Sequence, residues 1–165
     1  MPERTTVADF ETTRRLIGLG ILTLLGLSMQ LPVASAAPSE PAVFSTKKGA
    51  IRGYDPVAYF TEAREVKGEP EYSHSWNDAE WYFSSQENLD LFRNDPEAYS
   101  PQYGGYCAYA MSKGYYASID PKAWSVFDGK LYLNYSKSVR KTWSKDIPGH
   151  IERADRNWRK FRSGE

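Results

Sequence analysis

Residues 72–76 alternate between aromatic or histidine side chains and serines, which is the period of a half-buried β-strand. Residues 77–83 then supply a turn signal and an apolar returning strand. Ser84 and Glu87 have the spacing of a capping box, in which the serine oxygen accepts the amide proton three positions on. These patterns predict a hairpin and then a helix that ends near Asn94.

Residues 124–135 repeat the hairpin pattern around Asp128-Gly129. This dipeptide is a strong hairpin signal because both turn positions need positive φ. Ser136 is placed to cap a second helix, which we expect to end near Asp146. The two units have two interpretations: a degenerate duplication, or the recurrence of a common motif.

The last apolar residues, Ile151, Ala154, Trp158 and Phe161, have helical spacing. Basic residues cover the opposite face: Arg153, Arg156, Arg159, Lys160 and Arg162. Such a helix either closes the core with a solvated outer face or docks on an anionic surface. The sequence therefore predicts an α+β fold of small antiparallel hairpins, each followed by a helix, with a C-terminal amphipathic helix.

Residues 1–36 have the organisation of a cleaved signal peptide. Two arginines at 14–15 precede the apolar run 16–27, and Ala34-Ser35-Ala36 fits the small-x-small rule for cleavage after Ala36. A membrane anchor is the weaker alternative, because a span needs about 20 apolar residues. The arginine pair fits both ordinary secretory leaders and twin-arginine export signals. We expect a periplasmic or secreted protein with no integral membrane span after cleavage.

The remaining chain divides into a Pro-containing flexible linker at 37–48 and a single domain at 49–162. The 165 residues include 21 Lys+Arg and 21 Asp+Glu, and this zero net charge argues against a nucleic-acid partner. One Cys excludes a disulfide within the chain and a zinc site of three or four cysteines, and two His exclude a three-histidine site. An aromatic content of 15% predicts a ring-rich core or binding surface.

Four motifs, at 53–60, 72–76, 81–85 and 91–99, resemble the YHS domain family. Residues 103–110 and 128–135 look like the exported, stand-alone YHS proteins of bacteria, so the resemblance extends over nearly the whole mature chain.

The resemblance also implies where a metal site would lie in members of this family. In YHS domains of heavy-metal pumps, one cysteine follows the Asp-Pro-Val motif and two follow the tyrosine–phenylalanine strand. The matching positions here hold Ala58, Ser84 and Asn88, so that metal site cannot be carried over.

The remaining candidates for chemistry centre on Cys107, the only thiol. Cys107 and Met111 share one face if they span a helical turn, and with His74 or His150 they form a hypothetical soft-metal site suited to copper. The alternatives are a buried structural cysteine, and a redox-active or catalytic thiol. His74 also fits a hydrogen-bonded strand histidine, and we expect His150 to lie at the surface.

Tyr103, Tyr106 and Tyr109 predict either a pocket wall for a flat ligand or an aromatic core. No nucleophile elbow, phosphate loop or paired carboxylates are evident. The favoured hypothesis is an exported binding or accessory module for a soft metal or small ligand, with an envelope protein as a further candidate partner. The alternatives are a thiol-dependent redox protein or enzyme using Cys107, and a purely structural interaction domain.

Overall fold

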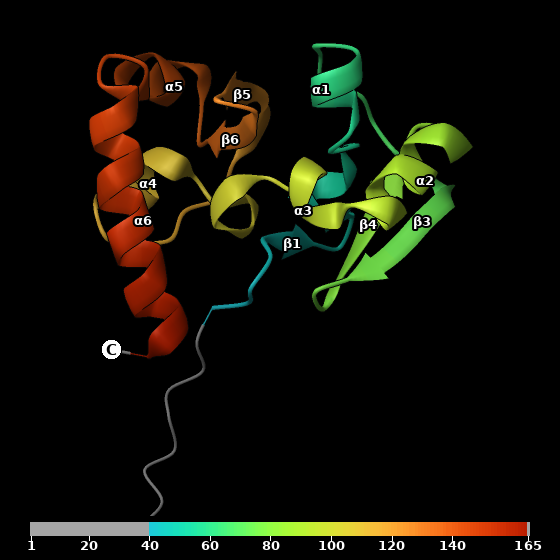
Figure 1. Ribbon diagram of the computed structural model, residues 1–165, viewed down its shortest axis with the longest axis horizontal. Coiled ribbons are helices and arrows are strands. Elements are labelled where there is room, and N and C mark those ends of the chain that lie inside the picture. The colour runs from blue at the N-terminus through green and yellow to red at the C-terminus, as the bar shows by residue number, and fades with distance from the viewer. Residues whose placement is uncertain (1–39, 165) are drawn as a thin grey trace, which may run out of the picture. The chain divides into compact units, whose positions relative to one another are not determined.

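The structure is a computed structural model that describes residues 40–164 (Figure 1). The predicted signal peptide and residues 37–39 of the predicted linker lie outside the described residues. The described part has the predicted α+β fold, with three two-stranded antiparallel sheets. In chain order its elements are β1 (Ser45–Thr46), β2 (Gly49–Ala50), η1 (Ile51–Gly53), α1 (Ala58–Thr61), β3 (Glu69–Trp76), β4 (Ala79–Phe83), α2 (Gln86–Asn94), α3 (Pro96–Tyr99), η2 (Gln102–Gly105), α4 (Ala108–Ser112), β5 (Asp120–Phe127), β6 (Lys130–Asn134), α5 (Lys137–Trp143) and α6 (Ile147–Ser163).

The first hairpin–helix unit comprises β3, β4 and α2. Its strands pair antiparallel, and Asn77 and Asp78 form the turn with φ of 52° and 58°. The predicted helix is present and ends at Asn94, but its cap is wrong by one residue. Ser85, with extended backbone, accepts a hydrogen bond from the Asn88 amide. The Ser84 hydroxyl instead donates a hydrogen bond to the Asp55 carboxylate.

The second hairpin–helix unit comprises β5, β6 and α5 and confirms the sequence prediction closely. Asp128 and Gly129 form its turn with φ of 50° and 68°. Ser136 caps α5 by accepting a hydrogen bond from the Val139 amide at 3.2 Å. The helix ends at Trp143, and α6 begins after Asp146, whose side chain caps it.

Corresponding features of the two units recur at one constant spacing along the chain. The capping serines Ser85 and Ser136 have nearly the same backbone angles, as do the capping aspartates Asp95 and Asp146 before the next helices. Both hairpins also carry an irregularity at the same place in their first strand. The shared geometry fits both interpretations from the sequence, so duplication stays a prediction.

The segment before the first unit contacts the rest of the fold at several residues. Val43 is buried, and β1 pairs with β2. The Phe44 amide donates a hydrogen bond to the Gly104 carbonyl at 2.8 Å. Part of the predicted linker therefore contacts the rest of the fold, and the division into a linker and a domain stays a prediction.

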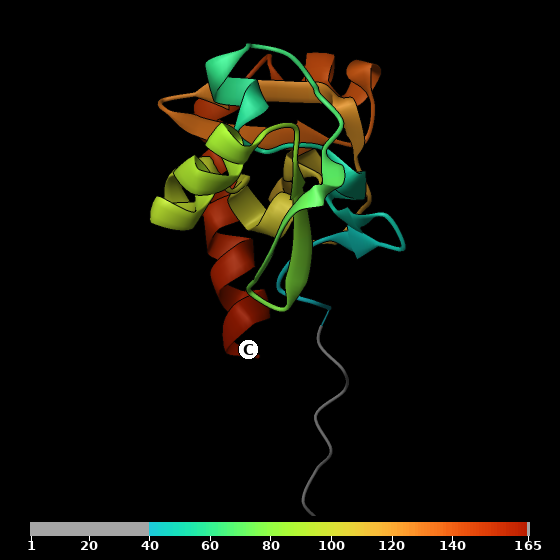
Figure 2. The same ribbon diagram turned by 90° about the vertical axis from the view of Figure 1, so that its right-hand side faces the viewer.

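The two units lie side by side in Figure 1, and Figure 2 looks along the line that joins them with the first unit in front. Their side chains share one buried core, to which β4 contributes Phe83 and β6 contributes Leu131 and Leu133. Burial of one such aliphatic or aromatic side chain contributes roughly 1.5–3 kcal/mol. A second cluster, which includes Trp143 and Ala154, packs α6 against the second unit. The C-terminal helix therefore closes the core, as one interpretation of the sequence predicted.

His150 is buried, whereas the sequence predicts a surface position for it. It lies in the first turn of α6 facing α4 and is only 7% exposed. Its Nδ1 is 2.9 Å from the Ser112 hydroxyl and 3.1 Å from an Arg153 nitrogen. Burial and the Arg153 charge lower the pKa of His150. Within residues 40–164, no helix is both long and apolar enough to cross a bilayer.

Candidate functional site

The three positions at which the family resemblance implies metal-binding cysteines lie together in the fold, around the carboxylate of Asp55. Asp55 precedes α1 and is fully buried. Its Oδ1 accepts hydrogen bonds from the amides of Val57 and Ala58 at 2.8 and 3.3 Å. Its Oδ2 accepts from the Ser84 amide, the Ser84 hydroxyl and the Asn88 side-chain amide, at 2.8, 2.7 and 2.7 Å.

This Asp55 network does not fit a soft metal ion. Copper(I) and similar ions prefer thiolate and thioether sulfur, and the network supplies neither. The lone pairs of the carboxylate are already occupied by N–H and O–H donors. The network instead joins the start of α1 to the end of β4 and to α2, so its role is structural.

Cys107 lies just before α4 in the second half of the chain, as Asp55 lies before α1 in the first half. It is 1% exposed, and its Sγ accepts hydrogen bonds from the amides of Tyr135 and Ala110 at 3.2 and 3.5 Å. The thiol also lies 3.8 Å from the Asn134 side-chain oxygen. Burial raises the pKa of Cys107, against the opposing effect of the backbone N–H groups. A buried, hydrogen-bonded neutral thiol is a poor nucleophile.

The other residues of the predicted copper site lie in different surroundings. Met111 is fully buried in the cluster beneath α6, whereas Cys107 belongs to the main core. His74 is half-buried on β3, with its ring 6.4 Å from that of Phe92. Among residues 40–164, no three His, Cys, Asp or Glu side chains are grouped so that they could hold a metal ion. Copper binding at Cys107, Met111 and His74 stays a prediction.

The three tyrosines predicted to wall a pocket point in different directions. Tyr103 is buried and donates its hydroxyl proton to Asp155 at 2.9 Å. The Tyr106 hydroxyl donates to a backbone carbonyl of the N-terminal segment at 3.1 Å, and burial raises its pKa to about 12. The Tyr109 ring lies 5.1 Å from the His150 ring. Of the three, only Tyr103 lines the cleft between the β3–β4 hairpin and α6.

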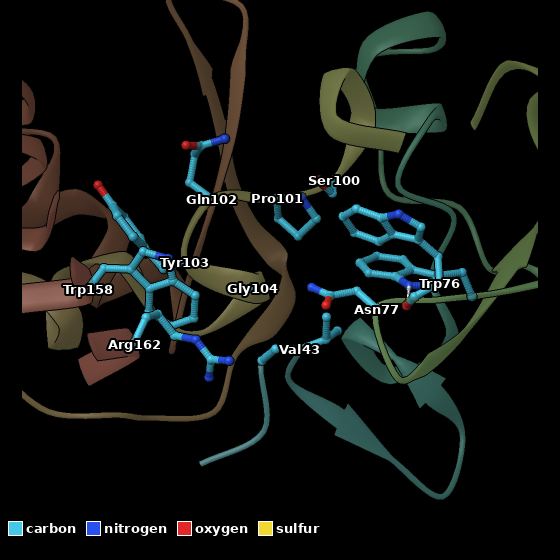
Figure 3. Close-up of a pocket in the computed structure, with 12 residues that line it drawn as sticks. Val43, Trp76, Asn77, Ser100, Pro101, Gln102, Tyr103, Gly104, Trp158 and Arg162 are labelled. Carbon is cyan, nitrogen blue, oxygen red and sulfur yellow. Dashed lines mark hydrogen bonds between the residues drawn. The ribbon is translucent and has the colours of Figure 1, made fainter. Parts of the chain in front are cut away.

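A cleft of about 380 Å³ lies between the β3–β4 hairpin of the first unit and the C-terminal helix α6, with η2 and the N-terminal segment completing its lining (Figure 3). We call it the aromatic cleft, because four rings from distant parts of the chain line it. Its lining comprises Ala42, Val43, Trp76, Asn77, Trp81, Ser100, Pro101, Gln102, Tyr103, Gly104, Trp158 and Arg162. In Figure 3, Trp76 lies on one side of the cleft, and Tyr103 and Trp158 lie on the other.

Polar groups stand among the rings of the aromatic cleft. The guanidinium of Arg162 lies 5.6 Å from the centre of the Trp158 ring, within the range of a cation–π contact. The Asn77 amide extends into the space between the two aromatic sides in Figure 3. The cleft therefore combines flat apolar surfaces with one positive charge and an amide.

The backbone at Gly104 determines how the N-terminal segment closes one side of the cleft. Gly104 has a φ of 61°, and a Cβ there would lie 1.9 Å from the Ala42 carbonyl oxygen. Only glycine permits this close approach, which brings Ala42 and Val43 into the lining.

The sequence predicted Trp76 on one face of a strand and Trp158 on one face of a helix. It did not predict that the two side chains line the same cleft. Arg162 was described only as part of a basic helix face. The signal that could have identified it is its position four residues after Trp158, on the same side of a helix. The buried role of Asp55 was also missed, because an Asp-Pro pair is ordinary turn chemistry.

Comparison with known proteins gives one family match. Residues 57–103 match the family model described as the YHS domain, from the end of the loop before α1 to η2. Neither the curated proteins nor the solved structures gave a significant match. The matched part contributes Trp76, Trp81 and Tyr103 to the aromatic cleft, whereas Trp158 and Arg162 lie outside it.

Proposed function

We propose that this chain, which contains a YHS domain at residues 57–103, is a non-catalytic binding module of the bacterial envelope. In this proposal the aromatic cleft takes a small, flat, partly apolar ligand that carries a negative charge. The ligand lies between the Trp76 and Trp158 sides, and Arg162 pairs with its charge.

The observation that carries the proposal is the cleft itself. Small-molecule sites are typically concave, about 300–1,000 Å³ in volume, and lined by aromatic side chains with a few polar groups. The aromatic cleft has that size, and four aromatic rings line it together with polar groups. Aromatic rings contribute about 0.5–1.5 kcal/mol per stacked or edge-on pair beyond their buried area. Trp76 and Trp158 are both only partly buried, so each has surface left for a ligand.

The lining of the cleft favours binding over catalysis. General acid–base catalysis needs a group whose pKa lies near the working pH. Tyr103 and Arg162 are the titratable residues of the lining, and burial and Asp155 raise the pKa of Tyr103 far from neutrality. The thiol of Cys107 and the imidazole of His150 are buried outside the lining.

The proposed envelope location rests on the signal-peptide pattern of residues 1–36. N-terminal sequencing of the protein recovered from the periplasmic or secreted fraction tests it. A mature chain beginning at Ala37 supports the proposal, and an uncleaved chain retained in the cytoplasm contradicts it.

Binding in the cleft is tested with anilinonaphthalene sulfonate, a flat aromatic anion whose fluorescence rises in apolar surroundings. We expect Arg162→Gln to weaken binding about three- to fivefold, because an exposed ion pair contributes up to about 1 kcal/mol. Trp76→Leu removes a ring wall and is expected to weaken binding about tenfold. Arg159→Gln is the matched control, since it removes an exposed arginine of the same helix that does not line the cleft.

Circular dichroism melting must first show that each variant is folded, because this dye also binds partly unfolded chains. Equal binding by the wild type, Arg162→Gln and Trp76→Leu would contradict the proposal. Equal weakening by Arg162→Gln and Arg159→Gln would indicate that only general positive charge matters.

A further inference from the structure

A second pocket, of about 480 Å³, shares no lining residue with the aromatic cleft. We call it the basic pocket, because four of its seven lining residues are cationic. The β1–β2 hairpin, η1, the segment before β3 and the start of β5 form it. It is lined by Thr46, Lys47, Lys48, Arg52, Tyr54, Lys67 and Pro121, with no carboxylate among them.

The four cations lack acidic partners within the described part of the chain. The salt bridges of residues 40–164 join Arg64 to Glu62, Arg153 to Asp146 and Arg156 to Glu152. None involves the basic pocket. Like charges gathered around a concavity repel one another and concentrate a positive potential there, which attracts anions. The whole chain has zero net charge, so this excess is local.

Arg52 is held in the pocket by an unusual backbone. It has a φ of 64°, between Ile51 at 42° and Gly53 at 77°. This left-handed region is unfavourable for residues with a Cβ, and strain of this kind is concentrated at functional sites. A matching run of positive φ occurs at residues 103–105, and there the central residue is Gly104. Arg52 thus occupies the central position of its run, at which the second run has Gly104, and glycine adopts this backbone without strain.

The side chain of Arg52 is also fixed in direction. Its Nε donates a hydrogen bond to the Ile119 carbonyl at 2.8 Å, and its guanidinium lies 5.8 Å from the centre of the Phe44 ring. No hydrogen bond within residues 40–164 uses its two terminal Nη groups. An arginine oriented in this way offers paired N–H donors of the geometry that suits a phosphate or carboxylate oxygen pair.

We propose that the basic pocket binds a small multivalent oxyanion of the phosphoryl class. Arg52 supplies a fixed pair of donors, and Lys47, Lys48 and Lys67 supply mobile positive charges around it. Tyr54 lines the same pocket. The pocket is independent of the proposed ligand of the aromatic cleft.

The test is isothermal titration calorimetry of the full-length chain with inorganic pyrophosphate at low ionic strength. Arg52→Gln/Lys67→Gln is expected to weaken binding at least about tenfold, because hydrogen bonds to charged groups are among the stronger ones. The charge-matched control is Arg159→Gln/Lys160→Gln, which removes two exposed cations of α6. Vesicles of anionic phospholipid, tested by co-sedimentation, distinguish a lipid headgroup from a free phosphorylated ligand.

A further variant, Arg52→Gly, separates binding from folding. Glycine adopts the left-handed backbone without strain, so we expect the variant to unfold at a temperature close to that of the wild type. Its pyrophosphate affinity is nevertheless expected to fall about tenfold. Pyrophosphate binding that the Arg52 variants leave unchanged would overturn the proposal. No detectable pyrophosphate binding, or binding to vesicles alone, would also overturn it.

Discussion

Replacement of Asp55 by alanine should be one of the most damaging single changes in the domain. The change removes the acceptor of five hydrogen bonds at a fully buried site. The amides of Val57 and Ala58 and the side chain of Asn88 then lose a charged partner inside the protein. A buried donor left without a partner costs about 1–3 kcal/mol, and hydrogen bonds to charged groups are at the upper end.

These costs do not add fully, because the chain relaxes and because removal of a buried carboxylate also removes its desolvation penalty. We therefore expect Asp55→Ala to lower the free energy of unfolding by roughly 3–5 kcal/mol. A domain of this size is stable by only about 5–15 kcal/mol. Asn88→Ala is a milder second variant, for which we expect a loss of about 1–3 kcal/mol.

The assay is urea unfolding followed by circular dichroism, with linear extrapolation to water. Asp95→Ala is the matched control, because Asp95 also precedes a proline and accepts a hydrogen bond from a helix amide but is exposed. Loss of an ordinary N-cap costs about 0.5–2 kcal/mol. If Asp55→Ala costs no more than Asp95→Ala, the buried network stabilises the fold no more than an ordinary N-cap does.

Three further predictions follow from buried groups and from close packing. Cys107 should react with iodoacetamide only after unfolding, since it is 1% exposed and burial raises its pKa; rapid alkylation of the native protein would contradict this. The folded-state pKa of His150 is lowered, so the free energy of unfolding should fall as pH drops below the usual 6.5 and level off below the folded pKa. His150→Gln should flatten that slope in urea unfolding series across pH, and an unchanged slope would exclude His150 as its source. Gly104→Ala should cost at least about 2 kcal/mol, because its Cβ would meet the Ala42 oxygen at 1.9 Å; a melting temperature equal to that of the wild type would contradict the close approach.

The sequence predicted the hairpins and their helices well because these depend on neighbouring residues. Asp128-Gly129 needs only its own backbone freedom to form a turn, and Ser136 needs only an amide three residues on. The misplaced first cap shows the limit of this reasoning. Ser84 and Ser85 are equivalent as local caps, and Asp55, far away in the chain, determines which of them is used.

The candidate sites were less predictable because they depend on packing between distant segments. The prolines of residues 37–48 led to the prediction of a linker that includes Val43. In the structure, residues far along the chain bury Val43. The Trp76 and Trp158 sides of the aromatic cleft come together only when α6 packs near the β3–β4 hairpin. In the same way, nothing local to Arg52 indicates that it lies beside Lys67 and Pro121.

The most direct test of the proposed function is the ¹H–¹⁵N spectrum of the tryptophan indoles during titration with anilinonaphthalene sulfonate. The chain has five tryptophans, so each indole N–H gives a separate reporter. We predict saturable shifts of the Trp76 and Trp158 signals, with Trp124 and Trp143 unchanged, because the latter two do not line the cleft. Shifts confined to Trp124, or no saturable shift at Trp76 and Trp158, would contradict ligand binding in the aromatic cleft.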